Sequence, residues 1–201
     1  MPEPEQEQRI RLAAAEQAKR LGASGPFTSD ELYAGFTVDG TRIPFTNQQR
    51  GIFKPAQMRY LLSVKTVFPS RGRKVWYDDQ REVHEQINRG SELIDYAFMG
   101  GDPDVADNRW LREARDEQIP ILYFLGVAPQ RWMAIWPTYV ADWSAPDLKA
   151  RLAFGAPAQV SLSADFPTAP ERRYGLRTVR QRLHQATFRE AVLTHTMADA
   201  H

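Results

Sequence analysis

The sequence predicts an α+β fold in which a twisted, closed or nearly closed β-barrel forms the core and helices flank it. Several short apolar stretches separated by turn residues are typical of strands, and a few longer segments rich in alanine or charge are typical of helices. Apolar residues make up 42% of the 201 residues, which is enough to bury one sizeable core. No internal repeat or low-complexity block interrupts this pattern.

The N-terminal quarter predicts two helices and a hairpin. Residues 8–22 are rich in alanine and long charged side chains, which favour a helix, and Gly22 can cap its end. A second helix is expected to start at Ser29 or Asp30. Two apolar stretches surround the pair at residues 39–40, Asp-Gly, which predicts a hairpin turn.

The remaining chain predicts strands interrupted by one short helix and closed by a long one. Strands are expected at residues 59–68, 92–99, 120–127, 131–140 and 158–166. Residues 107–118 predict a short amphipathic helix capped by Asp107, and residues 173–193 predict a long helix with a basic face. We divide the chain into an N-terminal helical segment (1–25), a barrel domain (26–168) and a basic C-terminal helix (169–201).

Positive charge is concentrated in one window. Residues 40–77 hold eight basic residues and no acid, whereas the rest of the chain holds 18 basic and 25 acidic residues. This segregation can give one surface a positive potential, which suits phosphate backbones. The window could also fold against the acidic stretch that follows it, and charge alone does not separate these two interpretations.

Several classes of chemistry have no residues to carry them. Cysteine is absent, which excludes disulfides, thiol nucleophiles and cysteine-bound zinc. None of the four histidines stands in a metal-ligand spacing, and no nucleophile elbow or Walker loop occurs. The N-terminus is acidic and polar, and the longest apolar run, residues 119–129, is too short to span a bilayer. We expect a cytoplasmic protein with no membrane partner, no cofactor or metal, and no catalytic residues.

Two segments place an aromatic residue near the end of a predicted strand, beside a loop. Residues 74–80 read KVWYDDQ and residues 94–101 read IDYAFMGG. Two aromatic faces can hold a flat ring, with about 1–3 kcal/mol per stacked base. A carboxylate in the plane of the ring can accept a hydrogen bond from the exocyclic amine of cytosine. The pattern fits a pocket for a base that has left the duplex, although core aromatics beside a solvated turn are the simpler interpretation of the spacing alone.

These segments resemble the SRA (SET- and RING-associated) domains, which flip 5-methylcytosine out of DNA into an aromatic-sided pocket. In that family Tyr-Glu-Asp-Asp is followed by Tyr-Thr-Gly-Ser-Gly-Gly, so Tyr96 matches the stacking tyrosine and Ala97 the threonine. The first segment leaves two registers open. Either Tyr77 stacks and Gln80 stands where the family has its base-reading aspartate, or Trp76 stacks and Asp79 reads the amine. We prefer Asp79, because a carboxylate can only accept.

A wider resemblance covers nearly the whole chain and is to the N-terminal half of bacterial SRA-HNH proteins, which are modification-dependent restriction endonucleases. It rests on five segments that follow in the same order, at residues 47–58, 77–79, 100–114, 119–140 and 172–193. In that family a PUA-like, SRA-like domain reads a modified cytosine and a C-terminal HNH domain cuts nearby. No His-Asn-His pattern follows residue 193 here. The resemblance implies a chain that binds and does not cut, a divalent metal only where an HNH domain is present, and a homodimer only in that longer context.

The resemblance implies a type IV-like targeting module that reads 5-methylcytosine or 5-hydroxymethylcytosine in double-stranded DNA. The candidate base-pocket residues are Trp76, Tyr77, Asp78, Asp79, Tyr96 and Ala97. The candidate DNA-backbone or groove residues are Arg50, Gly51, Lys54, Arg71, Arg73 and Lys74. Arg177, Arg180, Arg182 and Arg189 either continue the DNA surface or lie on a solvated linker helix.

Three alternatives stay open. A PUA-like barrel can bind RNA, or DNA with a glucosylated base or a phosphorothioate, and the last of these would need an apolar pocket beside the basic loop. A metal-dependent nuclease could use an unrecognised site among the 12 acids between Asp78 and Gln118. A structural partner would have all of these aromatics in its core.

Overall fold

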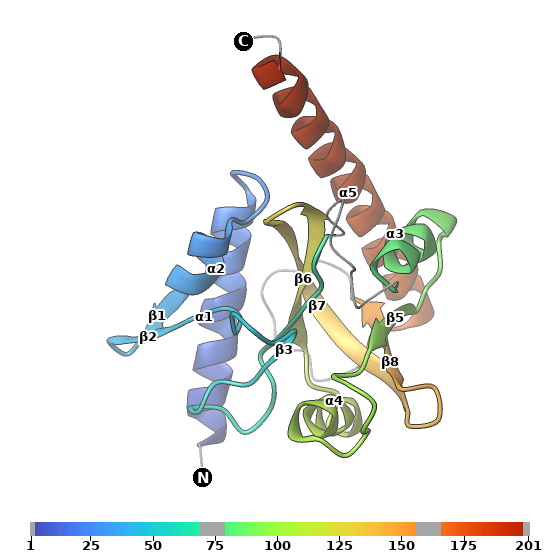
Figure 1. Ribbon diagram of the computed structural model, residues 1–201. Coiled ribbons are helices and arrows are strands. Elements are labelled where there is room, and N and C mark those ends of the chain that lie inside the picture. The colour runs from blue at the N-terminus through green and yellow to red at the C-terminus, as the bar shows by residue number, and fades with distance from the viewer. Residues whose placement is uncertain (1–2, 69–78, 156–165, 199–201) are drawn as a thin grey trace.

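The computed structural model describes residues 3–68, 79–155 and 166–198, with side chains described for residues 3–68, 82–155 and 166–188. A curled sheet lies at its centre, with helices on both sides (Figure 1). The helices are α1 (Pro4–Gly22), α2 (Ser29–Ala34), α3 (Asp79–Arg89), α4 (Ala106–Asp116) and α5 (Ala169–Ala198). The strands are β1 (Phe36–Val38), β2 (Thr41–Ile43), β3 (Ile52–Phe53), β4 (Ser63–Lys65), β5 (Ile94–Ala97), β6 (Ile121–Ala128), β7 (Arg131–Ser144) and β8 (Lys149–Phe154).

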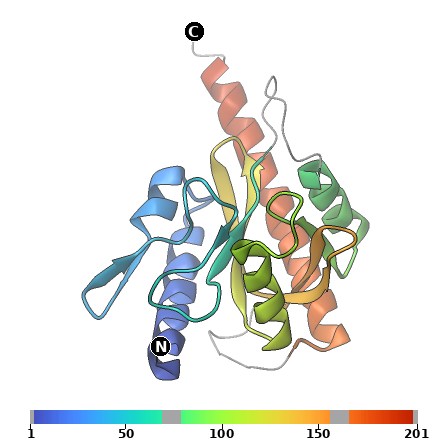
Figure 2. The ribbon, with the colours of Figure 1, turned by 60° about the horizontal axis from the view of Figure 1, so that its bottom comes forward.

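Six strands form one sheet in the order β3-β4-β6-β7-β8-β5, while β1 and β2 form a separate hairpin. Strands β4 and β6 are parallel, and every other neighbouring pair is antiparallel. The 14-residue strand β7 pairs with β6 along its first part and with β8 along its second, with a register shift after Val140. This long strand lets the sheet curl into a half-barrel, as the turned view in Figure 2 shows. The predicted α+β class is therefore confirmed.

The sheet is covered on both faces, because alternate residues of β6 enter different cores. Tyr123 and Leu125 pack in the core that includes α3, α4 and α5. Leu122 and Phe124 pack in the core that includes α1, α2 and the hairpin. Successive side chains of a strand point to opposite faces, so a strand buried on both faces is apolar throughout, as the predicted strand at 120–127 is. The N-terminal helix and the C-terminal helix thus share the same sheet.

A buried ion pair ties α1 to the strands. Arg11 donates to Glu7 at 2.8 Å and to the carbonyls of Leu61 and Pro120 at 3.0 and 2.8 Å. The second carboxylate oxygen of Glu7 accepts from the backbone N–H of Arg59. Both side chains are nearly inaccessible to water, so each charge is matched by its partner and by backbone dipoles. The pair fixes α1 against the segments that lead into β4 and β6.

Helix α5 approaches the sheet closely at a glycine. A Cβ atom on Gly175 would collide with the carbonyl oxygen of Gly155 and lie 2.8 Å from that of Phe154. The absence of a side chain therefore lets α5 rest directly on the end of β8. Leu176, Val179 and Leu183 point into the core from the same side of the helix.

Most predicted elements exist, with several corrections. The predicted helix at 8–22 is α1, but its cap is Ala23 and not Gly22. Helix α2 starts at Ser29 as predicted, and a capping box on Thr28 sets that start. The prediction that Asp107 caps the helix at 107–118 is wrong, because the cap is Val105 and Asp107 lies inside α4. Strand β8 and helix α3 were not predicted, and the strand expected at 158–166 lies almost wholly outside the described residues.

Within the described ranges, no helix combines the length and the apolar character that crossing a membrane requires.

Candidate functional site

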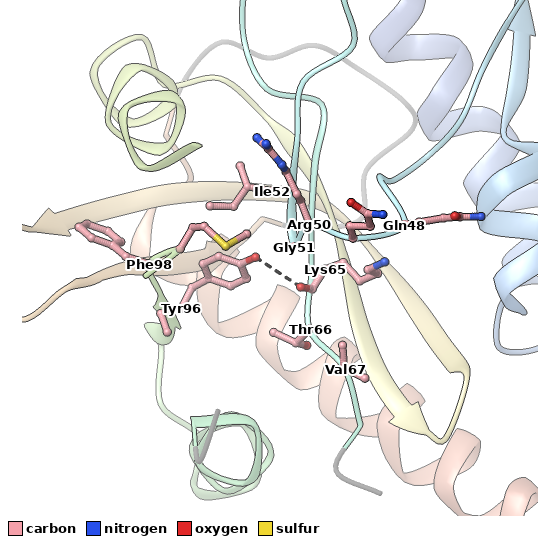
Figure 3. A pocket seen from close by; sticks show the side chains of 12 residues that line it. Gln48, Arg50, Gly51, Ile52, Lys65, Thr66, Val67, Tyr96 and Phe98 are labelled. Carbon is pink, nitrogen blue, oxygen red and sulfur yellow. Dashed lines mark hydrogen bonds between the residues drawn. The ribbon is translucent and has the colours of Figure 1, made fainter. Parts of the chain in front are cut away.

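A pocket of about 150 Å³ lies where the two edges of the curled sheet approach each other (Figure 3). Its walls come from the segment before β3, from the end of β4 and from β5 with the residues that follow it. The lining residues are Gln48, Gln49, Arg50, Gly51, Ile52, Lys65, Thr66, Val67, Tyr96, Ala97, Phe98 and Met99. Strands β3 and β5 are the outer strands of the sheet, and no ladder joins them in the described chain. The pocket therefore occupies the seam of the half-barrel.

The pocket brings together four candidate residues from the two groups that the sequence analysis named. Arg50 and Gly51 come from the predicted DNA-contacting group, and Tyr96 and Ala97 come from the predicted base pocket. About 45 residues separate the two pairs along the chain. The predicted residue Lys54 lies elsewhere, because its ammonium donates to the carbonyl of Met58 and sits 5.2 Å from the centre of the Trp110 ring.

Tyr96 links β5 to the end of β4 across the seam. Its hydroxyl donates to the carbonyl of Lys65 at 3.3 Å, and only 5% of the residue is exposed (Figure 3). The backbone N–H of Lys65 in turn donates to the carbonyl of Gly51 at 2.6 Å. A Cβ atom on Gly51 would lie 2.8 Å from the Tyr96 hydroxyl and 3.0 Å from the Lys65 carbonyl. Gly51 is thus required by the closeness of three chain segments.

The edge strand β5 also presents backbone groups at the seam. The N–H of Phe98 donates to Leu148 on the β8 side, whereas the N–H groups of Asp95 and Met99 donate to side chains of α3 and α4. Backbone groups of alternate residues in a strand point to the same side. The N–H and C=O of Ala97 therefore point away from β8, on the open edge beside the pocket that Ala97 lines. They offer one donor and one acceptor to a ligand.

The cations beside the pocket are held by the protein itself. Arg50 forms an ion pair with Asp107 on α4 at 3.1 Å, although more than half of the Arg50 side chain stays exposed. Figure 3 shows its side chain directed away from the ring of Tyr96. The ammonium of Lys65 donates to the carbonyl of Asn47 at 3.0 Å, and burial lowers the pKa of this lysine. Arg50 therefore faces solvent at the pocket rim, and Lys65 forms part of the wall.

An asparagine positions the loop that follows β5. Asn108 is fully buried, accepts from the N–H of Met99 and donates to the carbonyls of Met99 and Asp102. This fixes the turn that contains Gly100, whose φ of +66° is left-handed. Asn108 is structural, as its place near the helix start indicates, and it holds the Met99 side of the pocket in place.

Sequence reasoning missed most of the apolar wall. Ile52, Val67, Phe98 and Met99 line the pocket, but the last three are ordinary residues of predicted strands and Ile52 lies in no predicted element. Lys65 was counted as one of eight cations and given no role. The signal that could have identified Lys65 as a site residue is its position in a predicted strand within the same basic window, residues 40–77, as Arg50.

The other predicted site residues fall in or next to a segment outside the described residues. Trp76, Tyr77, Asp78, Arg71, Arg73 and Lys74 lie outside the described residues. Asp79 is the first residue of α3 and is followed by Gln80, so the acidic end of KVWYDDQ runs into a helix and not into a loop. The side chains of these two residues are not described. Residues 82–89 of α3 then pack beside β5, where Gln86 accepts from the N–H of Asp95 at 2.9 Å.

No cluster of three or more histidine, aspartate or glutamate side chains that could hold a metal ion occurs within the described part of the chain.

Comparisons with known proteins found no match to any family model, to any curated protein or to any solved structure.

Proposed function

We propose that this protein binds double-stranded DNA and holds a modified cytosine, flipped out of the duplex, in the pocket at the seam of the half-barrel. The observation that carries the proposal is that Arg50 and Gly51, expected to contact DNA, line the same pocket as Tyr96 and Ala97, expected in the base pocket. The resemblance to SRA domains, which also suggested those residues, is the reason for choosing cytosine. The chain would serve as the targeting module of a modification-dependent restriction endonuclease and would itself not cut.

The size of the pocket supports a single-ring ligand. Ligand pockets for drug-sized molecules measure roughly 300–1,000 Å³, whereas an engineered cavity of about 150 Å³ binds benzene. A pocket of about 150 Å³ is therefore suited to a pyrimidine more than to a purine. Ile52, Val67 and Met99 give it an apolar wall that suits the 5-methyl group of a modified cytosine.

The polar groups at the pocket suit a base and its phosphate. The donor and acceptor of Ala97 on the open edge of β5 match the mixed donors and acceptors of a pyrimidine edge. The Arg50 side chain, paired with Asp107 but more than half exposed at the rim, can bind the phosphate of the flipped nucleotide with its remaining donors.

The proposal is tested by competition binding at about 150 mM salt, with one duplex in unmodified, hemimethylated, fully methylated and 5-hydroxymethylated forms. A preference of tenfold or more for a modified duplex, worth about 1.4 kcal/mol, is the expected result. Equal, salt-sensitive binding to all four duplexes would remove the case for a cytosine reader and leave only a phosphate-binding surface.

A pocket-filling variant connects that preference to the site. Val67 is 48% exposed, so Val67→Trp can occupy the pocket from its rim without rebuilding the core. We expect this variant to lose the preference for modified DNA and to keep its affinity for the unmodified duplex. Leu148→Trp is the matched control, because Leu148 is a comparably exposed apolar residue that does not line the pocket. If Val67→Trp keeps the preference for the modified duplex, the modified base must bind at another site.

A further inference from the structure

The outward face of α5 is basic between residues 172 and 188. Between residues 172 and 188 the helix holds five arginines and one histidine, with neither aspartate nor glutamate. Leu176, Val179 and Leu183 point into the core, so the residues opposite them face solvent. The exposed residues of this outward face are Arg173, Tyr174, Arg177, Arg180, Gln181, His184 and Phe188.

Two large aromatic side chains are exposed within this basic face. Tyr174 is 50% exposed and Phe188 is 72% exposed. Only Val67 and Leu148 are comparable among the large apolar side chains that the structure describes. Tyr174 and Phe188 are 14 residues apart, which places them about 21 Å apart along a helix that rises about 1.5 Å per residue. Figure 1 shows the later part of α5 extending beyond the rest of the molecule.

The cations at the centre of the face are not neutralised by the fold. Arg172 and Arg173 both approach Glu92, at 3.3 and 4.0 Å. Arg177, in contrast, lies over the ring of Tyr174 at 5.5 Å. Neither Arg177 nor Arg180 has an acidic partner among the side chains that are described. An unpaired arginine stacked on an exposed tyrosine presents a charge and a flat apolar surface together.

We propose that the outward face of α5 binds single-stranded nucleic acid, with Arg177 and Arg180 on phosphates and Tyr174 and Phe188 stacked on bases. A positive groove or stripe interleaved with aromatic faces is the chemistry that holds unpaired strands without sequence preference. A duplex hides its base faces and would engage the arginines alone. A second copy of this chain fits the face poorly, because pairing two such faces would bring the arginines of both copies together.

The test is the binding of a fluorescein-labelled thymidine oligonucleotide of about 20 nucleotides, followed by anisotropy between about 50 and 200 mM salt. The variant Arg177→Gln with Arg180→Gln is expected to flatten the slope of log K against log salt by about 1.4, since each phosphate contact contributes about 0.7 for a single strand. The variant Tyr174→Ala with Phe188→Ala is expected to weaken binding at least tenfold without changing that slope. Arg9→Gln, an exposed arginine on α1, is the control and is expected to leave both unchanged.

Three outcomes would overturn the inference: no binding of the oligonucleotide by the parent, an unchanged slope in the arginine variant, or an equal loss in Arg9→Gln. A dimer in sedimentation that Phe188→Ala dissociates, together with no oligonucleotide binding, would assign the face to a second copy. All five substituted side chains are exposed, so the variants are expected to unfold at the parent's midpoint.

This inference stands apart from the proposed function. If the parent protein prefers the modified duplex but does not bind the oligonucleotide, only the role of α5 is refuted. The reverse result would refute only the cytosine pocket.

Discussion

Replacing Gly51 with alanine should damage the seam of the half-barrel, and the structure indicates by how much. The new methyl group would lie 2.8 Å from the hydroxyl of Tyr96 and 3.0 Å from the carbonyl of Lys65, two atoms that are hydrogen-bonded to each other at 3.3 Å. Overpacking of this kind costs about 1–3 kcal/mol, and a lost hydrogen bond about 1 kcal/mol. We expect Gly51→Ala to lower the free energy of unfolding by about 2 kcal/mol.

A double-mutant cycle tests whether the Tyr96 hydroxyl is the obstacle. Tyr96→Phe removes the oxygen that the new methyl group would strike, so the two changes together should be less harmful than their sum by at least about 0.5 kcal/mol. Urea denaturation gives the free energies, provided that the slopes of the four proteins agree. Gly101→Ala is the control, because no heavy atom lies within 4 Å of the Cβ it would add. An unchanged midpoint in Gly51→Ala, or strict additivity in the cycle, would refute this account of the seam.

Three further predictions concern the framework around the site. Gly175→Ala should lower the free energy of unfolding by about 1–2 kcal/mol, even though alanine favours helices over glycine by about 1 kcal/mol. Gly22→Ala is the control, because a Cβ there would make only ordinary contacts, and it should be neutral or stabilising. Equal effects of the two changes in calorimetry would contradict the close docking of α5. Arg11→Met should lower the free energy of unfolding in urea by about 3–5 kcal/mol, because it leaves the buried carboxylate of Glu7 without its cation. A loss below about 1 kcal/mol would contradict a buried ion pair at this position. Burial lowers the pKa of His84 below its ordinary value near 6.5, so the unfolded chain takes up the proton first as the pH falls. The free energy of unfolding should therefore decrease as the pH drops from about 7.5 to 5.5, and His84→Gln should make that decrease smaller.

The sequence predicted local structure well where a signal lies within a few residues. The dipeptide Asp39-Gly40 forms the turn that joins β1 to β2, with Val38 opposite Thr41, because Asp-Gly favours the left-handed backbone of a hairpin turn. The apolar stretch at 120–127 became a strand because its alternate residues enter two cores.

The predictions failed where the partner lies far along the chain. Asp107 looks like a helix cap, but Arg50, 57 residues earlier, makes it an ion-pair partner inside α4. Helix α3 was missed because its acidic start was assigned to a loop, although Val83 and Ile87 stand four residues apart on one buried face. The pocket itself depends on the curl of the sheet, which no local pattern specifies.

The open seam makes ligand binding and unfolding part of one equilibrium. The described edges β3 and β5 share no ladder, and the Tyr96 hydroxyl on β5 reaches only Lys65 on β4, beside the pocket. A ring bound in the pocket would contact both edges and connect two strands that share no ladder. By thermodynamic linkage, a ligand at a hundredfold excess over its Kd would add about 2.7 kcal/mol to the free energy of unfolding. Amide hydrogens of β5 should then exchange more slowly in the complex, so slowed exchange at this edge would report occupancy even before the ligand is identified.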